Sequence, residues 1–394
     1  MAEFSIILAG KGGNLCNMGC HYCSATGVSK KDSPGCKEWP IVIDYDAMFK
    51  TMDANPTFKE HRGPDKNLVL NLWGGDPLMH TKYWDEMLPK IREHYPDLNF
   101  KIFISTNGLL LGAKHIQDWI YDAHKKWGLE MQISHDGVGQ YVRSGKFDPF
   151  YDPKTKDVVV KMVRSGILTM INATLNQYNC SPLANFAYFQ KWRYENHLEN
   201  TPLYLIKINH NNDAEYTGPF RLRGENLKRY MDEMQTLWFQ SMTASKDDPY
   251  WKPYIEYFDN QMTRWKKVNN RNDALGGCGR FSVGLVDTTW CMNTKGEYVF
   301  CQLCNDPNDN PNPNCESAKV CEHCEFRNMH DCIPCPAMVQ SEDCEYKKEY
   351  IRAVLRMKPI YETYHNMLNT IQNQSNIIRN LEGQLNNNAC NYKK

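Results

Sequence analysis

The sequence predicts an α/β fold of parallel strands alternating with helices, followed by a small cysteine-rich domain and a C-terminal helix. Two observations predict this arrangement. Six apolar, β-rich runs alternate with helical patterns over residues 1–240, which is typical of parallel strands joined by crossover helices. The composition then changes, because residues 276–344 contain ten of the sixteen cysteines together with many Asn, Pro and Asp residues.

The predicted strands are short apolar segments, and most end in polar or glycine-rich residues. They cover residues 4–9, 67–73, 100–105, 129–134, 168–175 and 203–208. The helical patterns between and after them cover residues 45–52, 83–94, 113–126, 157–165, 182–194 and 225–242. Because the carboxyl ends of parallel strands in a β/α barrel share one rim, where ligands bind, we expect the polar segments to gather there.

Composition excludes several classes of protein. The 394 residues include 46 basic and 46 acidic side chains, and this balance argues against binding nucleic acid through its phosphates. There is no run of about 18 apolar residues that could span a membrane, and the first residues lack a secretory signal. We therefore expect a cytoplasmic protein, in which sixteen cysteines indicate metal or cluster ligation rather than disulfides.

Three cysteines lie close together after the first predicted strand. Cys16, Cys20 and Cys23 have the spacing C-x3-C-x2-C. Thiolates are the usual protein ligands of iron–sulfur clusters, and three thiolates leave one iron of a four-iron cluster open to a further ligand. The alternative is a zinc knuckle, since C-x2-C pairs are also common in zinc sites.

Together with the aromatic Tyr22, this triplet resembles the radical S-adenosylmethionine (radical SAM) family. The resemblance implies a partial (β/α)6 barrel and a [4Fe–4S] cluster held by the three cysteines, with SAM on its open iron. It also implies reductive cleavage of SAM to a 5′-deoxyadenosyl radical that abstracts hydrogen from a substrate. The electron would come from a donor such as flavodoxin or ferredoxin.

The turn after the second predicted strand has the sequence Gly74-Gly75-Asp76-Pro77. Paired glycines let the backbone approach a ligand without a Cβ clash, although such a turn is also an ordinary β-turn. The motif resembles the family's Gly-Gly-Glu-Pro, which implies contact with the amino group of SAM. Asp76 departs from the family's glutamate.

Polar residues also end the third and fifth predicted strands. Ser105, Thr106 and Asn107 resemble the hydroxyl and amide groups with which the family reaches the ribose or carboxylate of SAM. Asn172, on the fifth strand, is a further candidate at the rim.

The fourth predicted strand ends in Ser134-His135-Asp136-Gly137, which resembles the S-x-D-G of peptide-modifying members. The resemblance implies that Ser134 and Asp136 lie at the SAM site. Arg143 follows in a loop where many members place an arginine on the SAM carboxylate through a charge-assisted hydrogen bond. A solvated loop residue is the alternative for Arg143.

The second group of cysteines resembles the SPASM extension of radical SAM enzymes, which holds two auxiliary iron–sulfur clusters. The resemblance depends on Gly296-x4-Cys301 and on two C-x2-C pairs followed by Cys344, although one spacing is stretched and the next is shortened. The ligands of one auxiliary cluster would be Cys278, Cys291, Cys301 and Cys335, and those of the other Cys321, Cys324, Cys332 and Cys344. The first cysteine is ambiguous between Cys278 and Cys291, Cys304 could replace any ligand of the first set, and the role of Cys315 is open. A zinc ribbon is the alternative.

We expect four segments: a barrel over residues 1–240, a helical linker over 241–275, the auxiliary-cluster domain over 276–345 and a helical segment over 346–394. The last part is rich in Asn and Gln but carries apolar residues at Ile377, Ile378, Leu381 and Leu385. Its simplest interpretation is a helix packed on the flank of the barrel. A partner-binding or oligomerising helix is the alternative.

SPASM-bearing members mostly act on polypeptides, so the resemblance implies a peptide or protein substrate that is crosslinked, epimerised or oxidised. An anaerobic sulfatase-maturing enzyme is one alternative, although Gln302 stands where those enzymes place an aspartate base. The candidates for a catalytic residue are Asp136, Asp306 and Cys180. An alternative of another class is a non-catalytic protein that binds zinc or a cluster and interacts with partners.

Overall fold

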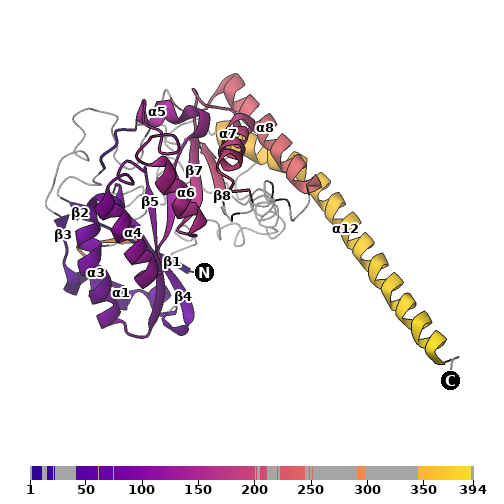
Figure 1. Ribbon diagram of the computed structural model, residues 1–394, viewed down its shortest axis with the longest axis horizontal. Coiled ribbons are helices and arrows are strands. Elements are labelled where there is room, and N and C mark those ends of the chain that lie inside the picture. The colour runs from indigo at the N-terminus through magenta and orange to yellow at the C-terminus, as the bar shows by residue number, and fades with distance from the viewer. Residues whose placement is uncertain are drawn as a thin grey trace, which may run out of the picture.

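The computed structural model describes residues 2–10, 16–20, 22, 41–60, 62–73, 75–199, 201, 205–210, 220, 222–244, 248, 251, 291–297 and 345–391. A parallel sheet of seven strands forms the centre of this part of the chain (Figure 1). Its strands are β1 (Ala2–Ile7), β4 (Gly63–Trp73), β5 (Leu98–Thr106), β6 (Glu130–Ser134), β7 (Leu168–Leu175), β8 (Leu205–His210) and β9 (Cys291–Asn293).

The order of the strands across the sheet is β8-β7-β6-β5-β4-β1-β9, and each neighbouring pair is parallel. From β1 to β8 the spatial order therefore follows the chain order. A sheet that always adds its next strand at the same edge curls in the manner of a β/α barrel. The six predicted strands and their parallel arrangement are confirmed.

Six helices connect or follow these strands, and each matches a predicted helix to within two residues at either end. They are α1 (Tyr45–Ala54), α3 (Thr81–His94), α4 (Lys114–Trp127), α6 (Lys156–Arg164), α7 (Pro182–Glu195) and α8 (Gly224–Thr243). Shorter elements that the sequence did not predict are β2 (Ala9–Gly10), β3 (Ile41–Val42), α2 (Pro56–Glu60), η2 (Pro77–His80), η3 (Gly137–Gly139) and α5 (Gln140–Ser144).

The two faces of the sheet differ in chemistry because successive side chains of a strand point to opposite faces. Side chains such as Ile6, Leu70 and Ile104 are fully buried in the main hydrophobic core, which the helices complete. Some of the residues between them are polar: Ser5 pairs in register with Asn71, and both are nearly buried. Ile7 and Trp73 form a small apolar cluster on the same face. The polar side chains of this second face include those near the rim, at the carboxyl ends of the strands.

The strand β9 was not predicted. Its Cys291 pairs in register with Ser5 of β1, so the start of the cysteine-rich segment extends the barrel sheet. The turn that follows contains Gly296, whose φ is +75°. A Cβ there would lie 2.4 Å from the carbonyl carbon of Ala47 in α1, so this close approach requires glycine.

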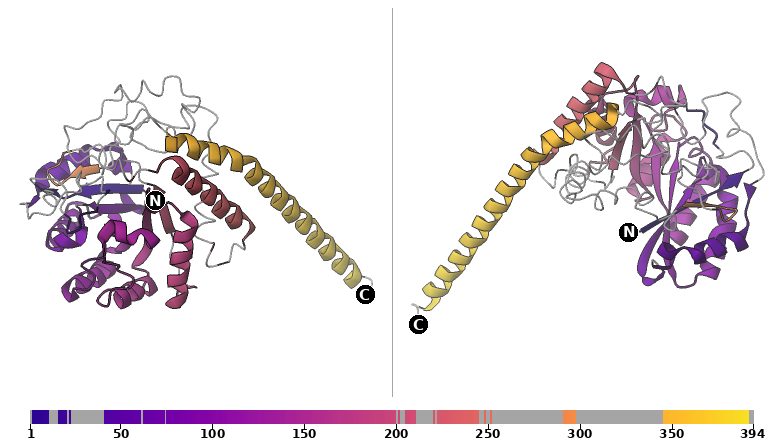
Figure 2. Two further views of the ribbon diagram at one scale, coloured as in Figure 1. Left: turned by 90° about the horizontal axis from the view of Figure 1, so that it is seen from above. Right: turned by 180° about the vertical axis from the view of Figure 1, so that it is seen from behind.

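The last helix, α12 (Glu345–Asn391), has 47 residues. Its first part packs against α8: Val354 and Met357 are buried, and Arg356 Nε donates to Gln235 Oε1 at 3.1 Å. The rest extends away from the barrel, and its carboxyl end is distant from the sheet in every view (Figures 1 and 2). The last part of the helix was expected to pack on the flank of the barrel, and this expectation is wrong for its described side chains, since Ile371, Ile378 and Leu381 are each more than half exposed. No helix of the described residues is long and apolar enough to cross a membrane.

Candidate functional site

The first two cysteines of the triplet lie in a loop whose sulfur atoms face N–H donors. The Sγ of Cys16 lies 3.5 Å from the backbone N of Met18 and 3.7 Å from Nδ2 of Asn107. The Sγ of Cys20 lies 4.0 Å from Nη1 of Arg143. N–H donors around sulfur are typical of the surroundings of cysteines that ligate a metal or cluster.

Asp76 joins the turn after β4 to the end of β5. Its side chain is 1% exposed and accepts hydrogen bonds from the Leu78 N–H at 3.1 Å, the Thr106 hydroxyl at 2.9 Å and the Asn107 N–H at 2.9 Å. Burial raises the pKa of this carboxyl, while the three hydrogen bonds oppose that rise. Gly75 adopts a φ of +68°, which favours glycine.

Asn107 continues this connection to the cysteine loop. Besides facing Cys16, its Nδ2 donates to Oδ1 of Asn17 at 2.7 Å. Asn107 therefore connects the predicted Gly-Gly-Asp-Pro turn to the cysteine loop. Its backbone N–H binds Asp76, and its side chain binds Asn17 in the loop. Pro77 is buried at the start of η2, and Gly74 lies outside the described residues.

We expect Thr106→Val to lower the free energy of unfolding by about 1–3 kcal/mol, because it leaves buried partners without a hydrogen bond. Thr106 is 1% exposed, and its hydroxyl donates to Asp76 and accepts from the Gly108 N–H at 3.1 Å. Urea denaturation measures the change. Thr236→Val, at an exposed position of α8, is the matched control and should change stability by less than about 0.5 kcal/mol.

Ser105, Ser134 and Asn172 lie on three neighbouring strands. The hydroxyl oxygens of Ser105 and Ser134 are 3.4 Å apart, and Gln132 Nε2 donates to Ser105 at 3.0 Å. Ser134 pairs in register with Asn172. All three predicted side chains are half-buried, so the rim presents hydroxyl and amide groups side by side.

Asp136 is a fully buried carboxylate that contacts three parts of the chain. It accepts hydrogen bonds from the Tyr22 hydroxyl, from Arg143 Nη2 at 3.1 Å and from the Thr174 N–H at 2.9 Å. The Arg143 guanidinium lies 5.5 Å from the centre of the Tyr22 ring. Burial raises the pKa of Asp136, and the ion pair with Arg143 opposes the rise.

The Tyr22–Asp136–Arg143 group therefore attaches the cysteine loop to β6, β7 and α5. Arg143 is held on Asp136 and beside Cys20, and the side chain is only 10% exposed. Its predicted contact with the SAM carboxylate stays a prediction. The contact of Tyr22 with Asp136 was not predicted, because the two residues are 114 positions apart and no local pattern links them.

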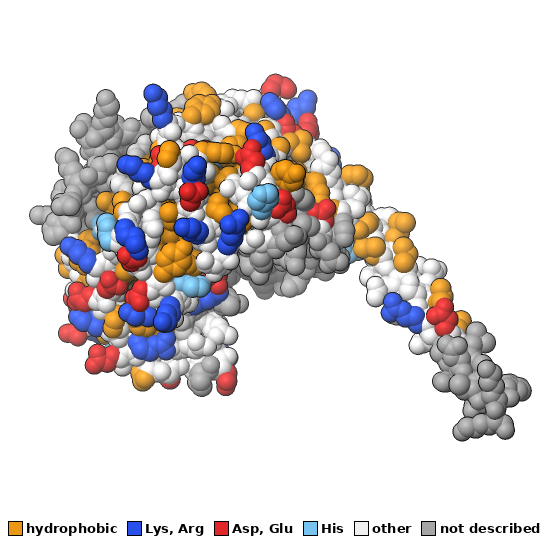
Figure 3. Space-filling view, viewed as in Figure 1, with side chains coloured by type: hydrophobic (Ala, Val, Ile, Leu, Met, Phe, Trp, Pro, Cys, Tyr) orange, Lys and Arg blue, Asp and Glu red, His pale blue; other side chains and the backbone are white. Residues whose placement is uncertain are grey.

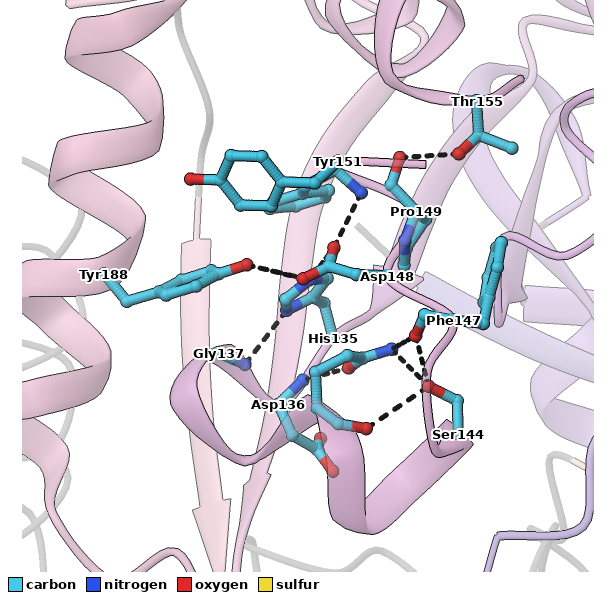
Figure 4. Close-up of polar contacts among 12 residues, drawn as sticks. His135, Asp136, Gly137, Ser144, Phe147, Asp148, Pro149, Tyr151, Thr155 and Tyr188 are labelled. Carbon is cyan, nitrogen blue, oxygen red and sulfur yellow. Dashed lines mark hydrogen bonds and ion pairs between the residues drawn. The ribbon is translucent and has the colours of Figure 1, made fainter. Parts of the chain in front are cut away.

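His135, next to Asp136, forms a second buried group (Figure 4). Its Nδ1 accepts from the Gly137 N–H at 2.9 Å, so the neutral ring carries its proton on Nε2, which donates to Asp148 Oδ1 at 2.9 Å. Tyr188 donates its hydroxyl proton to Asp148 Oδ2 at 2.8 Å. These contacts fix the turn that carries Asp136.

Acidification should destabilise the protein through this group. Burial lowers the pKa of His135 from its ordinary 6.5. Burial alone raises the pKa of Asp148, but hydrogen bonds from His135 and Tyr188 outweigh it and lower that pKa. A histidine that stays neutral in the folded state while the unfolded chain takes up a proton stabilises the fold above pH 6.5 and loses this contribution as pH falls.

We therefore expect the unfolding free energy to fall by up to about 1.4 kcal/mol per pH unit through His135 alone below its ordinary pKa. His135→Asn keeps an acceptor for the Gly137 N–H and should flatten this dependence. Urea denaturation between about pH 7 and about pH 5.5 measures the slope. An unchanged slope in His135→Asn would contradict the assignment, and the exposed His115→Asn is the control.

The other predicted residues lie apart from this site or outside the described residues. Cys180 packs against the core, and burial raises the pKa of its thiol. For Cys291 the structure describes the backbone, which lies in β9, but not the side chain. Outside the described residues lie Cys23, Asp306, Cys278, Cys301, Cys304, Cys315, Cys321, Cys324, Cys332, Cys335 and Cys344. Among the described residues, no three His, Cys, Asp or Glu side chains converge as a metal site.

The fold is similar to that of solved structures of anSMEcpe, an anaerobic sulfatase-maturating enzyme of the SPASM-type radical SAM class. The structure with bound AdoMet (SAM) matches with a TM-score of 0.55 and 13% identity, over 93% of this chain and 100% of that one. The structure with AdoMet and the Kp18Cys peptide matches with a TM-score of 0.57 and 12% identity, over 93% and 99%. No protein-family model and no curated protein match the sequence.

Proposed function

We propose that this chain, which has the fold of a radical SAM enzyme, cleaves SAM reductively and abstracts hydrogen from a peptide or protein substrate. One observation carries the proposal. The loop with Cys16 and Cys20 is attached to the barrel by a buried group, Tyr22–Asp136–Arg143, and by Asn107. These contacts hold the cysteine loop at the carboxyl ends of the parallel strands, where β/α barrels bind their ligands.

The residues of the loop fit a [4Fe–4S] cluster held by Cys16, Cys20 and Cys23. Two of these sulfurs face N–H donors, and such donors around thiolate ligands tune an iron–sulfur cluster. When bound, the cluster and SAM supply the electron transfer and the radical that removes hydrogen. The protein orients these groups and excludes water and competing hydrogen donors.

The rim residues supply contacts for SAM in this proposal. The backbone of Gly74 and Gly75 accepts hydrogen bonds from the SAM amino group, while Asp76 fixes the shape of that turn through its three hydrogen bonds. The half-buried hydroxyls of Ser105 and Ser134, with the Asn172 amide, bind the ribose or the carboxylate. Arg143 contributes positive charge beside Cys20.

A polypeptide substrate is supported by the similar fold of anSMEcpe, which has been solved with a bound peptide. The chemistry of the modification is a crosslink, an epimerisation or an oxidation. Sulfatase maturation is the second candidate, because the similarity to that enzyme extends over 93% of this chain. The auxiliary clusters on the second cysteine group, and flavodoxin or ferredoxin as electron donor, belong to the same proposal.

Metal analysis after anaerobic reconstitution tests this proposal against the non-catalytic alternative. Three cubane clusters correspond to about twelve irons and about twelve sulfides per chain. Protein that retains zinc and takes up no sulfide would contradict the proposal. Colorimetric iron and sulfide determinations, with zinc measured by mass spectrometry on the same sample, distinguish the two outcomes.

A further inference from the structure

Apolar side chains at the spacing of a coiled coil begin where α12 still packs on the barrel, with Tyr364 against the core, and continue along its projecting part. Steps of four and three residues lead along one side of the helix, and seven of the eight positions are apolar. The eight positions are Ile360, Tyr364, Met367, Ile371, Gln374, Ile378, Leu381 and Leu385. We call these eight positions the heptad stripe. A heptad repeat sustained over more than three heptads is typical of a coiled coil.

Most of this stripe is open to solvent in the single chain. The exposed fractions are 60% for Met367, 56% for Ile371, 55% for Ile378 and 52% for Leu381. Figure 3 shows hydrophobic side chains and few charges along the projecting helix. Such a row of exposed aliphatic side chains marks an interaction surface.

The composition of the helix indicates that it needs a partner. Residues 366–391 contain many asparagines, which form helices poorly, and the described side chains over 366–382 are mostly exposed, so little tertiary packing supports them. Helices in proteins are stabilised mainly by packing of their apolar face. A segment of about 39 Å, at 1.5 Å per residue, would therefore fray unless the heptad stripe were covered.

The residue types favour one occupant, a second copy of this chain. Isoleucine at the first core position of the heptad (Ile371 and Ile378) with leucine at the fourth (Leu381) favours two parallel strands. The e and g positions of the heptad flank the core. From residue 363 onward these positions carry one charged side chain, Glu382. Identical helices thus meet without repulsion, whereas a different partner is normally selected by complementary charges at these positions.

Gln374 supports the same arrangement. It occupies a core position, and in a parallel, in-register pair each core position faces its own counterpart. Its amide both donates and accepts, so two copies of this residue can hydrogen-bond to one another. A membrane surface suits this helix poorly, because Arg379 is its one basic residue between positions 366 and 391.

We propose that the heptad stripe pairs with the stripe of a second copy, so that the protein is a homodimer joined by a parallel two-stranded coiled coil over residues 360–385. This inference is independent of the proposed chemistry. It assigns the projecting helix a role in assembly, with the barrel of each copy attached through the packing of α12 on α8.

Sedimentation of the reconstituted full-length chain tests the proposal. We expect a mass twice the 45.9 kDa of one chain. Ile371→Asp combined with Ile378→Asp should weaken the dimer by roughly a hundredfold or more, because it buries unpaired carboxylates. The matched control is Asn373→Asp with Asn380→Asp, which adds two charges to the outer side of the same turns and should leave the dimer intact.

A monomeric wild-type chain at tens of micromolar, or a core variant that stays dimeric, would overturn the proposal. Gln374→Glu and Gln374→Lys test the orientation, since each alone should weaken the dimer and their equimolar mixture should restore it. Failure of the mixture to recover would exclude the parallel register. Iron content, measured on every variant, shows whether the barrel is intact.

Discussion

Replacing Asp136 with asparagine is expected to lower the free energy of unfolding by about 3–5 kcal/mol, the usual cost of leaving a buried charge without its partner. The Arg143 side chain is only 10% exposed and pairs with the fully buried Asp136. The same substitution weakens the attachment of the cysteine loop through Tyr22. We therefore also expect less iron per chain after reconstitution. Urea denaturation and iron determination measure the two effects.

The matched control for this substitution is Asp118→Asn. Asp118 also forms an ion pair, with Lys114, but both side chains are more than half exposed. Exposed ion pairs contribute about 0–1 kcal/mol, so the control should remain close to the wild type in stability and in iron content. The double variant Asp136→Asn with Arg143→Gln should regain part of the lost stability because it removes both charges. An Asp136→Asn variant as stable as the control would refute this role.

Replacing Cys20 with serine is expected to remove one cluster, about four irons per chain, and to abolish cleavage of SAM. The loop would keep Cys16 and Cys23, and two thiolates are too few for a cubane that leaves one iron open. Iron determination and anaerobic assay of 5′-deoxyadenosine measure the two losses. If the auxiliary clusters are present, their iron should stay unchanged.

Cys180→Ser is the matched control for Cys20→Ser. Cys180 is partly buried against the core, and burial raises the pKa of its thiol, so it is protonated at neutral pH. We expect unchanged iron content and unchanged SAM cleavage. If both variants lost iron equally, the loss could not be attributed to the cysteine loop.

The barrel could be predicted because each strand has a strong local signal. Segments such as β7 (Leu168–Leu175) and β4 (Gly63–Trp73) combine apolar, β-branched residues with polar ends, and amphipathic helices separate them. By contrast, β9 has three residues, Cys-Met-Asn, and no periodicity can be read from so short a segment. Its place in the sheet depends on pairing with β1, nearly 290 residues earlier in the chain.

The candidate site was predicted in part, since its motifs could be located but their contacts could not. Asp76, Asp136 and Arg143 were each predicted to lie at the SAM site. In the structure Asp76 binds Thr106 and the backbone, and Asp136 binds Arg143 and Tyr22. Whether a polar side chain meets a ligand or a neighbouring loop depends on tertiary distances, which no local pattern encodes.

The contacts of His135 could not be anticipated for the same reason. Neither Asp148 nor Tyr188 belongs to a sequence motif. Tyr188 reaches this group because α7 packs beside the turn after β6, and Asp148 lies in the segment that follows α5. The C-terminal helix was predicted from its periodicity, but its exposure was not. The sequence pattern shows an apolar stripe, whereas the structure shows that the barrel covers only the beginning of that helix.

Formation of 5′-deoxyadenosine tests the central claim most directly. Anaerobically reconstituted enzyme with a full complement of iron and sulfide is incubated with SAM and dithionite, and the product is quantified by chromatography with mass detection. We expect 5′-deoxyadenosine from the wild-type and Cys180→Ser proteins and none from Cys20→Ser. No 5′-deoxyadenosine from fully reconstituted wild-type protein would contradict it.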